Sequence, residues 1–281
     1  MTASTLACAL VACTNGVTID EGEVFTSDLE QGSVGWTSAC EYSHSLSDDP
    51  IVFPGMPGAS HLHDFFGATT TNAYSTYRSL RSSPTTCEIR EDTSAYWVPA
   101  LYVRGVRVLP QHADIYYFTD VDPATIEPFP SGMRIIAGNA HATEAQQLNI
   151  AWYDCGPGDG GGLSQRASQP YRCNPGYRTR AHLRFPSCWD GVRLTSSDQS
   201  HVVYPNRGVC PPTHPRPLPQ LSYQVAFPVD VDLTGATLAS GAAITLHADF
   251  FNAWQPARLA QLVDECTNAG IACGGNVPPP P

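Results

Sequence analysis

Glycine and proline interrupt this sequence so often that long helices are excluded. The 281-residue chain contains 23 glycines and 25 prolines, and both residue types destabilise a helix interior. Between them lie short apolar runs rich in β-branched and aromatic side chains, which is the composition of β-strands. At 42% apolar residues, the chain can still bury a large core. The pattern therefore predicts a mainly β protein with long loops.

Residues 95–110 show the strand pattern most clearly, because two apolar runs flank the turn residues Arg104-Gly105 and predict a hairpin. Further strands are expected at 51–53, 114–118, 134–137, 148–153, 180–185, 201–204, 221–227 and 243–251. No helical pattern between them could form parallel crossover units. An antiparallel β-sandwich, or a jelly-roll-like arrangement, is therefore predicted as a single domain over residues 17–273.

The last part of the chain carries one predicted helix. Leu259, Leu262, Val263 and Cys266 fall on one helical face, and Pro256 suits the first turn. Residues 274–281 end in four prolines, a composition that stays extended. We interpret this segment as a Pro-rich tail.

Residues 1–16 are small and apolar, and they end in a lipobox-like stretch from Leu10 to Cys13. Two interpretations stay open. The segment is either a signal peptide with a truncated start, which would give the protein an N-terminal lipid anchor, or a short buried strand with Cys8 and Cys13 as structural cysteines. No later stretch approaches the ~20 apolar residues of a membrane span.

The charge of the chain argues against nucleic acid as a partner. The sequence has 26 acidic residues against 15 basic ones, a formal net charge of −11. All the basic residues are arginines, and they do not cluster into the basic stripe that phosphate binding requires. We therefore expect neither nucleic-acid binding nor attachment to a membrane through a polybasic surface.

Ten cysteines, with no C-x-x-C pair among them, indicate disulfides rather than a metal ribbon. Eight of them follow the N-terminal segment, which is enough for four bridges. Pairing between sequence neighbours predicts the bridges Cys40–Cys87, Cys155–Cys173, Cys188–Cys210 and Cys266–Cys273. An oxidising, extracellular or cell-surface location follows.

Two histidine-containing segments at opposite ends of the chain resemble each other. His61 and His63 stand two residues apart, as do His247 and Asp249, and each segment continues into a pair of phenylalanines. Residues two apart in a strand face the same side of a sheet. We therefore expect three imidazoles and one carboxylate to line one cleft.

This set of side chains suits two kinds of chemistry. Neutral imidazoles and a carboxylate can bind one divalent metal ion such as zinc, iron, manganese or copper. The same groups can act as general acid and base, because histidine titrates near neutral pH and an adjacent aspartate fixes its tautomer. The alternative is that these histidines only support loops through hydrogen bonds.

A third region offers candidates for substrate binding. Trp189 could stack on a sugar ring, and Asp190 could bind sugar hydroxyls or move a proton, as could Asp64 beside His63. Core packing and an Asx turn explain Trp189 and Asp190 equally well. His201 is a candidate catalytic residue with a supporting role as its alternative.

Several stretches, taken in order, resemble the DUF1996 family, a domain of unknown function found in secreted fungal and actinobacterial proteins, some of them fused to WSC or other carbohydrate-binding modules. The matching stretches are Asp48 to Val52, Pro57 to His63, Thr85 to Cys87, Ala95 to Trp97, Phe185 to Gly191, His201 to Tyr204 and His247 to Trp254. The chain departs from the pattern at Ala253, where we expect glycine. The resemblance implies an extracellular setting and an association with glycans, but no established reaction.

Two functions from different classes are therefore expected. The first is a hydrolase or lyase that acts on extracellular polysaccharide, with His61, His63, His247, Asp249 and His201 as acid, base or metal ligands. The second is a non-catalytic, disulfide-stabilised module that binds glycan or cell wall. A glycoside hydrolase usually needs two carboxylates, whereas a lyase favours a histidine or tyrosine base with an arginine that neutralises a uronate.

Overall fold

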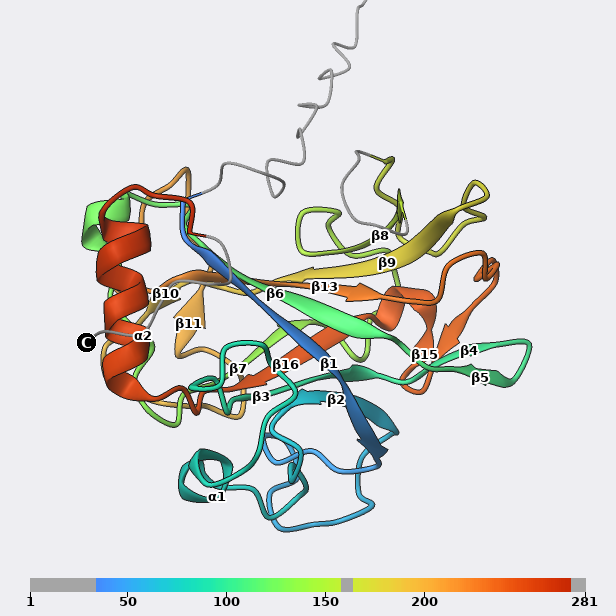
Figure 1. Ribbon diagram of the computed structural model, residues 1–281, viewed down its shortest axis with the longest axis horizontal. Coiled ribbons are helices and arrows are strands. Elements are labelled where there is room, and N and C mark those ends of the chain that lie inside the picture. Colours follow the sequence, from blue (N-terminus) through green and yellow to red (C-terminus); the bar gives the residue numbers. More distant parts are fainter. Residues whose placement is uncertain (1–33, 158–163, 274–281) are drawn as a thin grey trace, which may run out of the picture.

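Nine antiparallel strands form one sheet that folds over onto itself (Figure 1). The computed structural model describes residues 34–157 and 164–273; the N-terminal segment 1–16 and the tail 274–281 lie outside these ranges. The strand order is β7-β16-β3-β2-β1-β6-β13-β9-β8. In chain order, the strands are β1 (Trp36–Leu46), β2 (His63–Gly67), β3 (Ala95–Pro99), β6 (His112–Phe118), β7 (Arg134–Gly138), β8 (Ala151–Pro157), β9 (Tyr177–Arg184), β13 (Gln220–Ala226) and β16 (His247–Phe251).

The long strand β1 belongs to both halves of this sheet. Its first part pairs with β6 and its second part with β2, with a register shift between Tyr42 and His44. A bulge of this kind bends a strand and increases its twist. The half containing β2, β3, β16 and β7 thereby turns to face the half containing β6, β13, β9 and β8, and the predicted antiparallel sandwich is confirmed.

Large aromatic side chains fill the space between the two halves. Tyr96 of β3 lies edge-to-face against Tyr223 of β13, with ring centroids 5.6 Å apart. The Tyr223 hydroxyl also donates a 2.7 Å hydrogen bond to the Asp249 carbonyl in β16. Trp36 stacks on Tyr117 at 4.7 Å, and all of these side chains are at most 1% exposed.

The predicted C-terminal helix is α2 (Pro256–Leu262), continued by the π-helical segment Val263–Asn268. Its buried face carries Leu259, Leu262, Val263 and Cys266, which join the main core. In Figure 1 it covers the left end of the sandwich. None of the helices that the structure describes is both long and apolar enough to cross a membrane.

All four predicted disulfides are present. The bridges Cys40–Cys87, Cys155–Cys173, Cys188–Cys210 and Cys266–Cys273 join sequence neighbours among the eight later cysteines. The last one attaches the end of the described chain to the helical segment after α2. Four disulfides are consistent with an extracellular protein.

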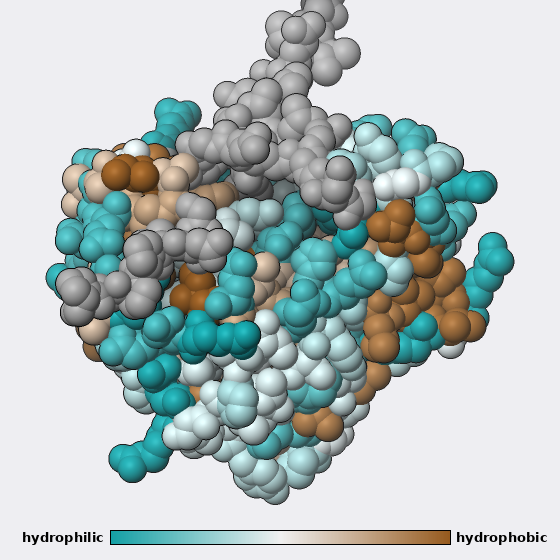
Figure 2. All heavy atoms as spheres, viewed as in Figure 1, coloured by the Kyte–Doolittle hydropathy of each residue, from teal (hydrophilic) through white to brown (hydrophobic). Residues whose placement is uncertain are grey.

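Two small sheets extend the sandwich. β10 (Cys188–Trp189) pairs with β11 (Val202–Val203) and β12 (Arg216–Pro217), while β4 (Leu101–Val103), β5 (Val106–Val108), β14 (Thr237–Leu238) and β15 (Gly241–Ala242) form the other sheet. The predicted hairpin is confirmed as β4 and β5, joined by Arg104 and Gly105 with φ values of 50° and 77°. Figure 2 shows apolar residues gathering at this end of the molecule, and the hairpin residue Val106 is 68% exposed.

Some predicted strands differ from those observed. The strand expected at 51–53 is wrong, because the side chain of Asp49 accepts hydrogen bonds from the Ile51 and Val52 amides and holds a turn there. The segment 243–251 is a strand only from His247, since residues 243–245 form a 3-10 turn. At 148–153, the strand likewise starts only at Ala151.

A loop-rich lobe covers the outer face of β2, β3 and β16. It consists of residues 47–62 and 68–86, includes the short helix α1 (Tyr77–Arg81), and lies at the bottom of Figure 1. Phe65, Trp97 and Phe251 point from the sheet into this lobe and pack with Leu80 in a second apolar cluster. The candidate site lies between the lobe and the same sheet face.

Candidate functional site

The sheet register brings the two histidine segments together. His63 pairs with Pro99 of β3, and Asp249 pairs with Trp97 of the same strand. In this antiparallel register, His247, two residues before Asp249, lies opposite Pro99. His63 and His247 therefore lie on either side of β3 at the same height in the sheet. His61 precedes β2, and its Nε2 lies 3.1 Å from Nε2 of His247.

Backbone carbonyls orient two of the three imidazoles. Nδ1 of His63 lies 3.0 Å from the Asp48 carbonyl, and Nδ1 of His247 lies 2.8 Å from the Thr245 carbonyl. A carbonyl can only accept a hydrogen bond, so Nδ1 carries the hydrogen and Nε2 keeps its lone pair. In metal sites, a histidine likewise donates a hydrogen bond from the ring nitrogen that does not bind the metal. Nε2 of His63 is buried and has no hydrogen-bond partner among the described residues.

Two buried carboxyl groups complete the cluster. Asp249 is 1% exposed, and neither of its carboxylate oxygens has a hydrogen-bond partner in the described ranges. Asp49 comes from the lobe, and the Ile51 and Val52 amides both donate to its Oδ1, at 2.8 and 2.9 Å. Ligand atoms of Asp49, Asp249 and His63 lie within 4.8 Å of one another, as do those of His61, His63 and His247. We call these five residues the His/Asp cluster.

Burial dominates the ionisation of the cluster. Desolvation lowers the pKa of His247 to about 4 and that of His63 well below its usual value, so both imidazoles are neutral at pH 7. Desolvation also raises the pKa of Asp49, and together with the charge of Asp49 it raises that of Asp249 well above the ordinary value. Neither carboxyl has an arginine partner in the described part of the chain. A bound dication would supply the missing positive charge.

The spacing of the nitrogens suits a metal ion. Two nitrogens each ~2.1 Å from zinc lie about 3.0 Å apart at a right angle and about 3.4 Å apart at the tetrahedral angle. The observed 3.1 Å between Nε2 of His61 and of His247 falls within this range. Imidazole and carboxylate ligands without thiolate suit zinc, manganese or iron. The cluster could hold one such ion while leaving a carboxylate free as a base.

One side of the cluster faces solvent. His63, His247, Asp49 and Asp249 are buried, whereas His61 is only partly buried. Desolvation lowers the pKa of His61, and the charge of His141, in the loop after β7, lowers it further. A substrate would therefore approach from the side of His61.

The structure does not bring Asp64 into the cluster. As the neighbour of His63 in β2, it points to the opposite face of the sheet. There it is 1% exposed, forms an ion pair with Arg107 of β5, and accepts a hydrogen bond from Ser45 of β1. These contacts favour a structural role over the predicted contact with substrate.

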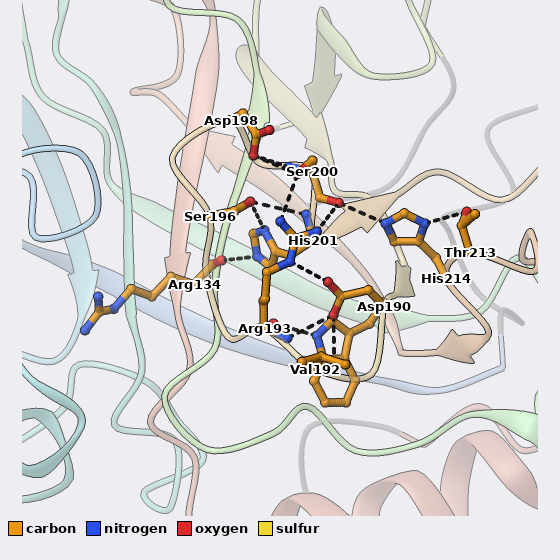
Figure 3. Close-up of polar contacts among 11 residues, drawn as sticks. Arg134, Asp190, Val192, Arg193, Ser196, Asp198, Ser200, His201, Thr213 and His214 are labelled. Carbon is orange, nitrogen blue, oxygen red and sulfur yellow. Dashed lines mark hydrogen bonds and ion pairs between the residues drawn. The ribbon is translucent and has the colours of Figure 1, made fainter.

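Asp190 lies in a closed network of polar contacts (Figure 3). Its carboxylate accepts hydrogen bonds from the Val192 and Arg193 amides at 2.8 and 3.0 Å and pairs with the Arg193 guanidinium at 2.7 Å. Arg193 in turn donates to the hydroxyl and the carbonyl of Ser200. These backbone contacts form the Asx turn that the sequence offered as the alternative interpretation of Asp190.

His201 and Trp189 also have structural partners. Nδ1 of His201 lies 2.9 Å from the Ser196 hydroxyl, and its Nε2 lies 2.8 Å from the Arg134 carbonyl, so both ring nitrogens are occupied (Figure 3). Trp189 is partly buried against the main core, and its indole N–H donates to the Arg193 carbonyl at 2.6 Å. Neither residue lies in the His/Asp cluster, so a supporting role is favoured for both.

Asp49 was missed by reasoning from the sequence. It stands in Asp48-Asp49-Pro50, a combination typical of turns, and it does hold a turn through one of its oxygens. Its nearness to Asp249 results from the fold of the lobe. The available signal was an acidic pair close before the segment with His61 and His63.

Comparisons with known proteins give one match. The model of a family described as "Domain of unknown function (DUF1996)" matches residues 49–254, a range that contains the whole His/Asp cluster. The comparisons with curated proteins and with solved structures gave no significant match.

Proposed function

The chain belongs to the DUF1996 family, and we propose that it is a divalent-metal-dependent enzyme that acts on extracellular polysaccharide. The observation that carries the proposal is the buried set of ligand atoms without partners: Nε2 of His63 and both oxygens of Asp249. Leaving a buried polar atom unpaired costs about 1–3 kcal/mol. His63 and Asp249 have ligand atoms within 4.8 Å of each other, so these unpaired atoms are best explained by an ion that binds there.

The proposed centre assigns a role to each residue of the cluster. The Nε2 atoms of His61, His63 and His247 bind the ion. Asp249 lies beside it, with a ligand atom within 4.8 Å of that of His63, and the ion compensates its buried charge. Asp49 keeps one oxygen on backbone amides, so its other oxygen is available to bind the ion or to take a proton from the reacting group. A metal ion polarises an oxygen of the substrate or lowers the pKa of a bound water, and either role fits hydrolysis or elimination.

The polysaccharide part of the proposal has separate support. Four disulfides suit an extracellular protein, and the resemblance implies secreted relatives associated with glycans. The acidic, lysine-free surface suits a substrate that is not an anionic nucleic acid. A non-catalytic glycan-binding or wall-binding module is the competing function, and the experiments below separate the two.

The first experiment measures metal binding. Protein purified without a histidine tag is stripped with a chelator and titrated with zinc, manganese and iron(II) by calorimetry. We expect one ion per chain for wild type, and loss of that binding in His63→Ala and His247→Ala. His112→Ala is the matched control, because this histidine lies outside the cluster on β6. Unchanged stoichiometry and affinity in both cluster variants would refute the metal centre.

The second experiment measures product release from neutral, acidic and amino-sugar polymers. Chromatography detects hydrolysis, and ultraviolet absorbance detects the unsaturated ends that a lyase leaves. The two cluster variants should lose about two orders of magnitude in rate or more, whereas His112→Ala should match wild type. Retention on a polymer without product, unchanged in the cluster variants, would support the non-catalytic module instead.

A further inference from the structure

A groove runs along the edge of the sandwich beside β7. It consists of two adjoining depressions of about 380 and 350 Å³ that share Ile150 and Tyr204, each within the ~300–1,000 Å³ typical of ligand sites. We call it the edge groove. Its lining includes Asp120 and Arg184 at one end, Ile136 and Gly138 of β7 at the other, and Ile150 and Tyr204 between them.

The edge groove starts one strand away from the His/Asp cluster. Its residues Ile136 and Gly138 pair with Asp249 and His247, respectively, across β7 and β16, and paired strands are ~4.8 Å apart. Gly138 contributes no side chain at the level of His247. The next groove residues reach the same segment, because the Gln146 amide donates to the Leu246 carbonyl at 2.8 Å. The groove and the cluster are therefore contiguous along the sheet.

The lining of the groove combines amides with apolar surface and has no net charge. Five amide side chains line it: Asn139, Gln146, Gln147, Asn149 and Gln199. Those of Gln147 and Asn149 have no hydrogen-bond partner in the described ranges. Ile136, Ile150 and Val202 provide apolar surface beside the ring of Tyr204.

The single cation and the single anion in the groove neutralise each other. Arg184 donates to the Asp120 carboxylate at 2.8 Å, and the same carboxylate also accepts from Ser187. No unpaired cation is therefore left among the described lining residues to bind an acidic sugar. A protein with a formal charge of −11 also gives no general attraction for a polyuronate.

We infer that the edge groove binds a neutral polysaccharide chain and holds it beside the His/Asp cluster, an inference that rests on the proposed function. Amides can hydrogen-bond to sugar hydroxyls, whereas the tyrosine ring and the aliphatic side chains can cover the apolar faces of sugar rings. The groove replaces Trp189, Asp190 and Asp64 as the place where substrate binds.

The test measures binding separately from catalysis. Hexasaccharides of β-1,4-glucan, β-1,3-glucan and β-1,4-xylan, together with oligogalacturonate and oligoalginate, are titrated against metal-stripped protein by calorimetry. We expect at least one neutral oligosaccharide to bind and the acidic ones not to bind. The double variant Gln147→Ala/Asn149→Ala should weaken binding at least ten-fold, and Tyr204→Ala should weaken it too. Gln165→Ala, outside the groove, should leave it unchanged.

The His63→Ala variant keeps the two proposals apart. It should bind the neutral oligosaccharide as wild type does while losing the metal. Three results would overturn the groove assignment and leave the metal centre unaffected. They are tighter binding of the acidic oligosaccharides, no binding of any neutral oligosaccharide, and unchanged affinity in the Gln147→Ala/Asn149→Ala variant. Failure of the metal titration alone would overturn the proposed function and leave the groove as a glycan-binding site.

Discussion

At the scale of single residues, Asp49 shows how one side chain can serve two parts of the molecule. One oxygen holds the turn at the start of the lobe, and the other is left for the His/Asp cluster. Asparagine keeps an acceptor for the turn but removes the negative charge. For this reason, Asp49→Asn tests the role of the Asp49 charge in the cluster while keeping the turn at the start of the lobe.

We expect Asp49→Asn to fold normally and to bind metal about ten-fold more weakly or worse, because a carboxylate that compensates the ion is lost. Metal titration and thermal unfolding of the stripped protein measure the two effects. Asp122→Asn is the control, since this exposed carboxylate likewise accepts from a nearby amide, that of Ala124, but lies outside the cluster. Equal affinities in the two variants would contradict a role for Asp49 in the centre.

Asp92 is another buried acid, and it lies outside the His/Asp cluster. Its carboxylate accepts a 2.6 Å hydrogen bond from Tyr96, which is joined to Tyr117. Desolvation raises its pKa from 3.8 to about 7. Between these values, the folded protein keeps a proton that the unfolded chain has released. The stability that this group contributes is therefore complete below pH ~3.8 and is lost as the pH rises through 7.

We expect Asp92→Asn to remove this part of the pH dependence, because the amide resembles the protonated acid. The wild-type contribution corresponds to about 4 kcal/mol of unfolding free energy between pH 4 and pH 7, as an order of magnitude. Denaturant unfolding of metal-stripped protein across this range measures it. The same slope in wild type and in Asp92→Asn would show that the carboxyl is ionised in the folded state.

The chemistry of the site could be predicted from the sequence only where local geometry decides it. Alternation in strands predicted that His247 and Asp249 share a face, and the sheet register then brings them to His61 and His63. Asp49 could not be predicted, because a turn-forming aspartate shows no sign of the tertiary contact it makes. Asp190 and His201 have the same residue types as the cluster, and only their hydrogen-bond partners in the structure favour supporting roles for them.

At the scale of elements, the junction of β7 and β16 fixes the position of His247. Gly138 has φ +78°, and a Cβ there would lie 2.4 Å from the Leu246 carbonyl oxygen and 2.9 Å from Cα of His247. Only glycine fits this close approach. The edge strand β7 therefore packs directly against the start of β16 and the backbone of His247.

We expect Gly138→Ala to lower stability by more than the ~1–2 kcal/mol of left-handed strain alone, and to weaken metal binding as His247 shifts. Gly105→Ala is a matched control, because Gly105 has φ +77° but a Cβ at this position would meet nothing within 4 Å. Gly105→Ala should lower stability by the cost of left-handed strain alone, with no change in metal affinity. Thermal unfolding and metal titration of both variants make the comparison, and equal metal affinities would contradict the coupling.

Most strands could be predicted from apolar runs and turn residues, whereas their exact starts could not. The segment 243–251 has the pattern of one apolar run, but Ala243 to Thr245 form a 3-10 turn, and its last carbonyl holds His247. The segment 51–53 is apolar as well, yet side-chain hydrogen bonds from its amides to Asp49 compete with strand pairing.

At the scale of the whole molecule, the order of the strands could not be predicted from the sequence. β16, from the end of the chain, inserts between β7 and β3, and β1 is shared between two half-sheets. Core packing between residues far apart in the sequence decides such pairings. The disulfides were easier to predict, because each joins neighbours in a chain with an even number of later cysteines.

We expect metal to stabilise the whole fold, since the ion would join the lobe to both strands of the site. An ion that binds only the folded state at 100 times its dissociation constant adds about 2.7 kcal/mol. The melting temperature of stripped wild type should therefore rise with metal concentration, and that of His247→Ala should not. A rise of the same size in His247→Ala would place the stabilising ion elsewhere.

Two histidines of the proposed centre, His61 and His247, are separated by 186 positions along the chain. During synthesis, His61 and His63 leave the ribosome long before His247, and the sheet between β7 and β3 is complete only once β16 is present. The complete set of ligands therefore arises only once nearly the whole domain has been made and folded. In the proposed centre, the compartment in which folding finishes, rather than the one in which the chain is synthesised, would then determine which metal is bound.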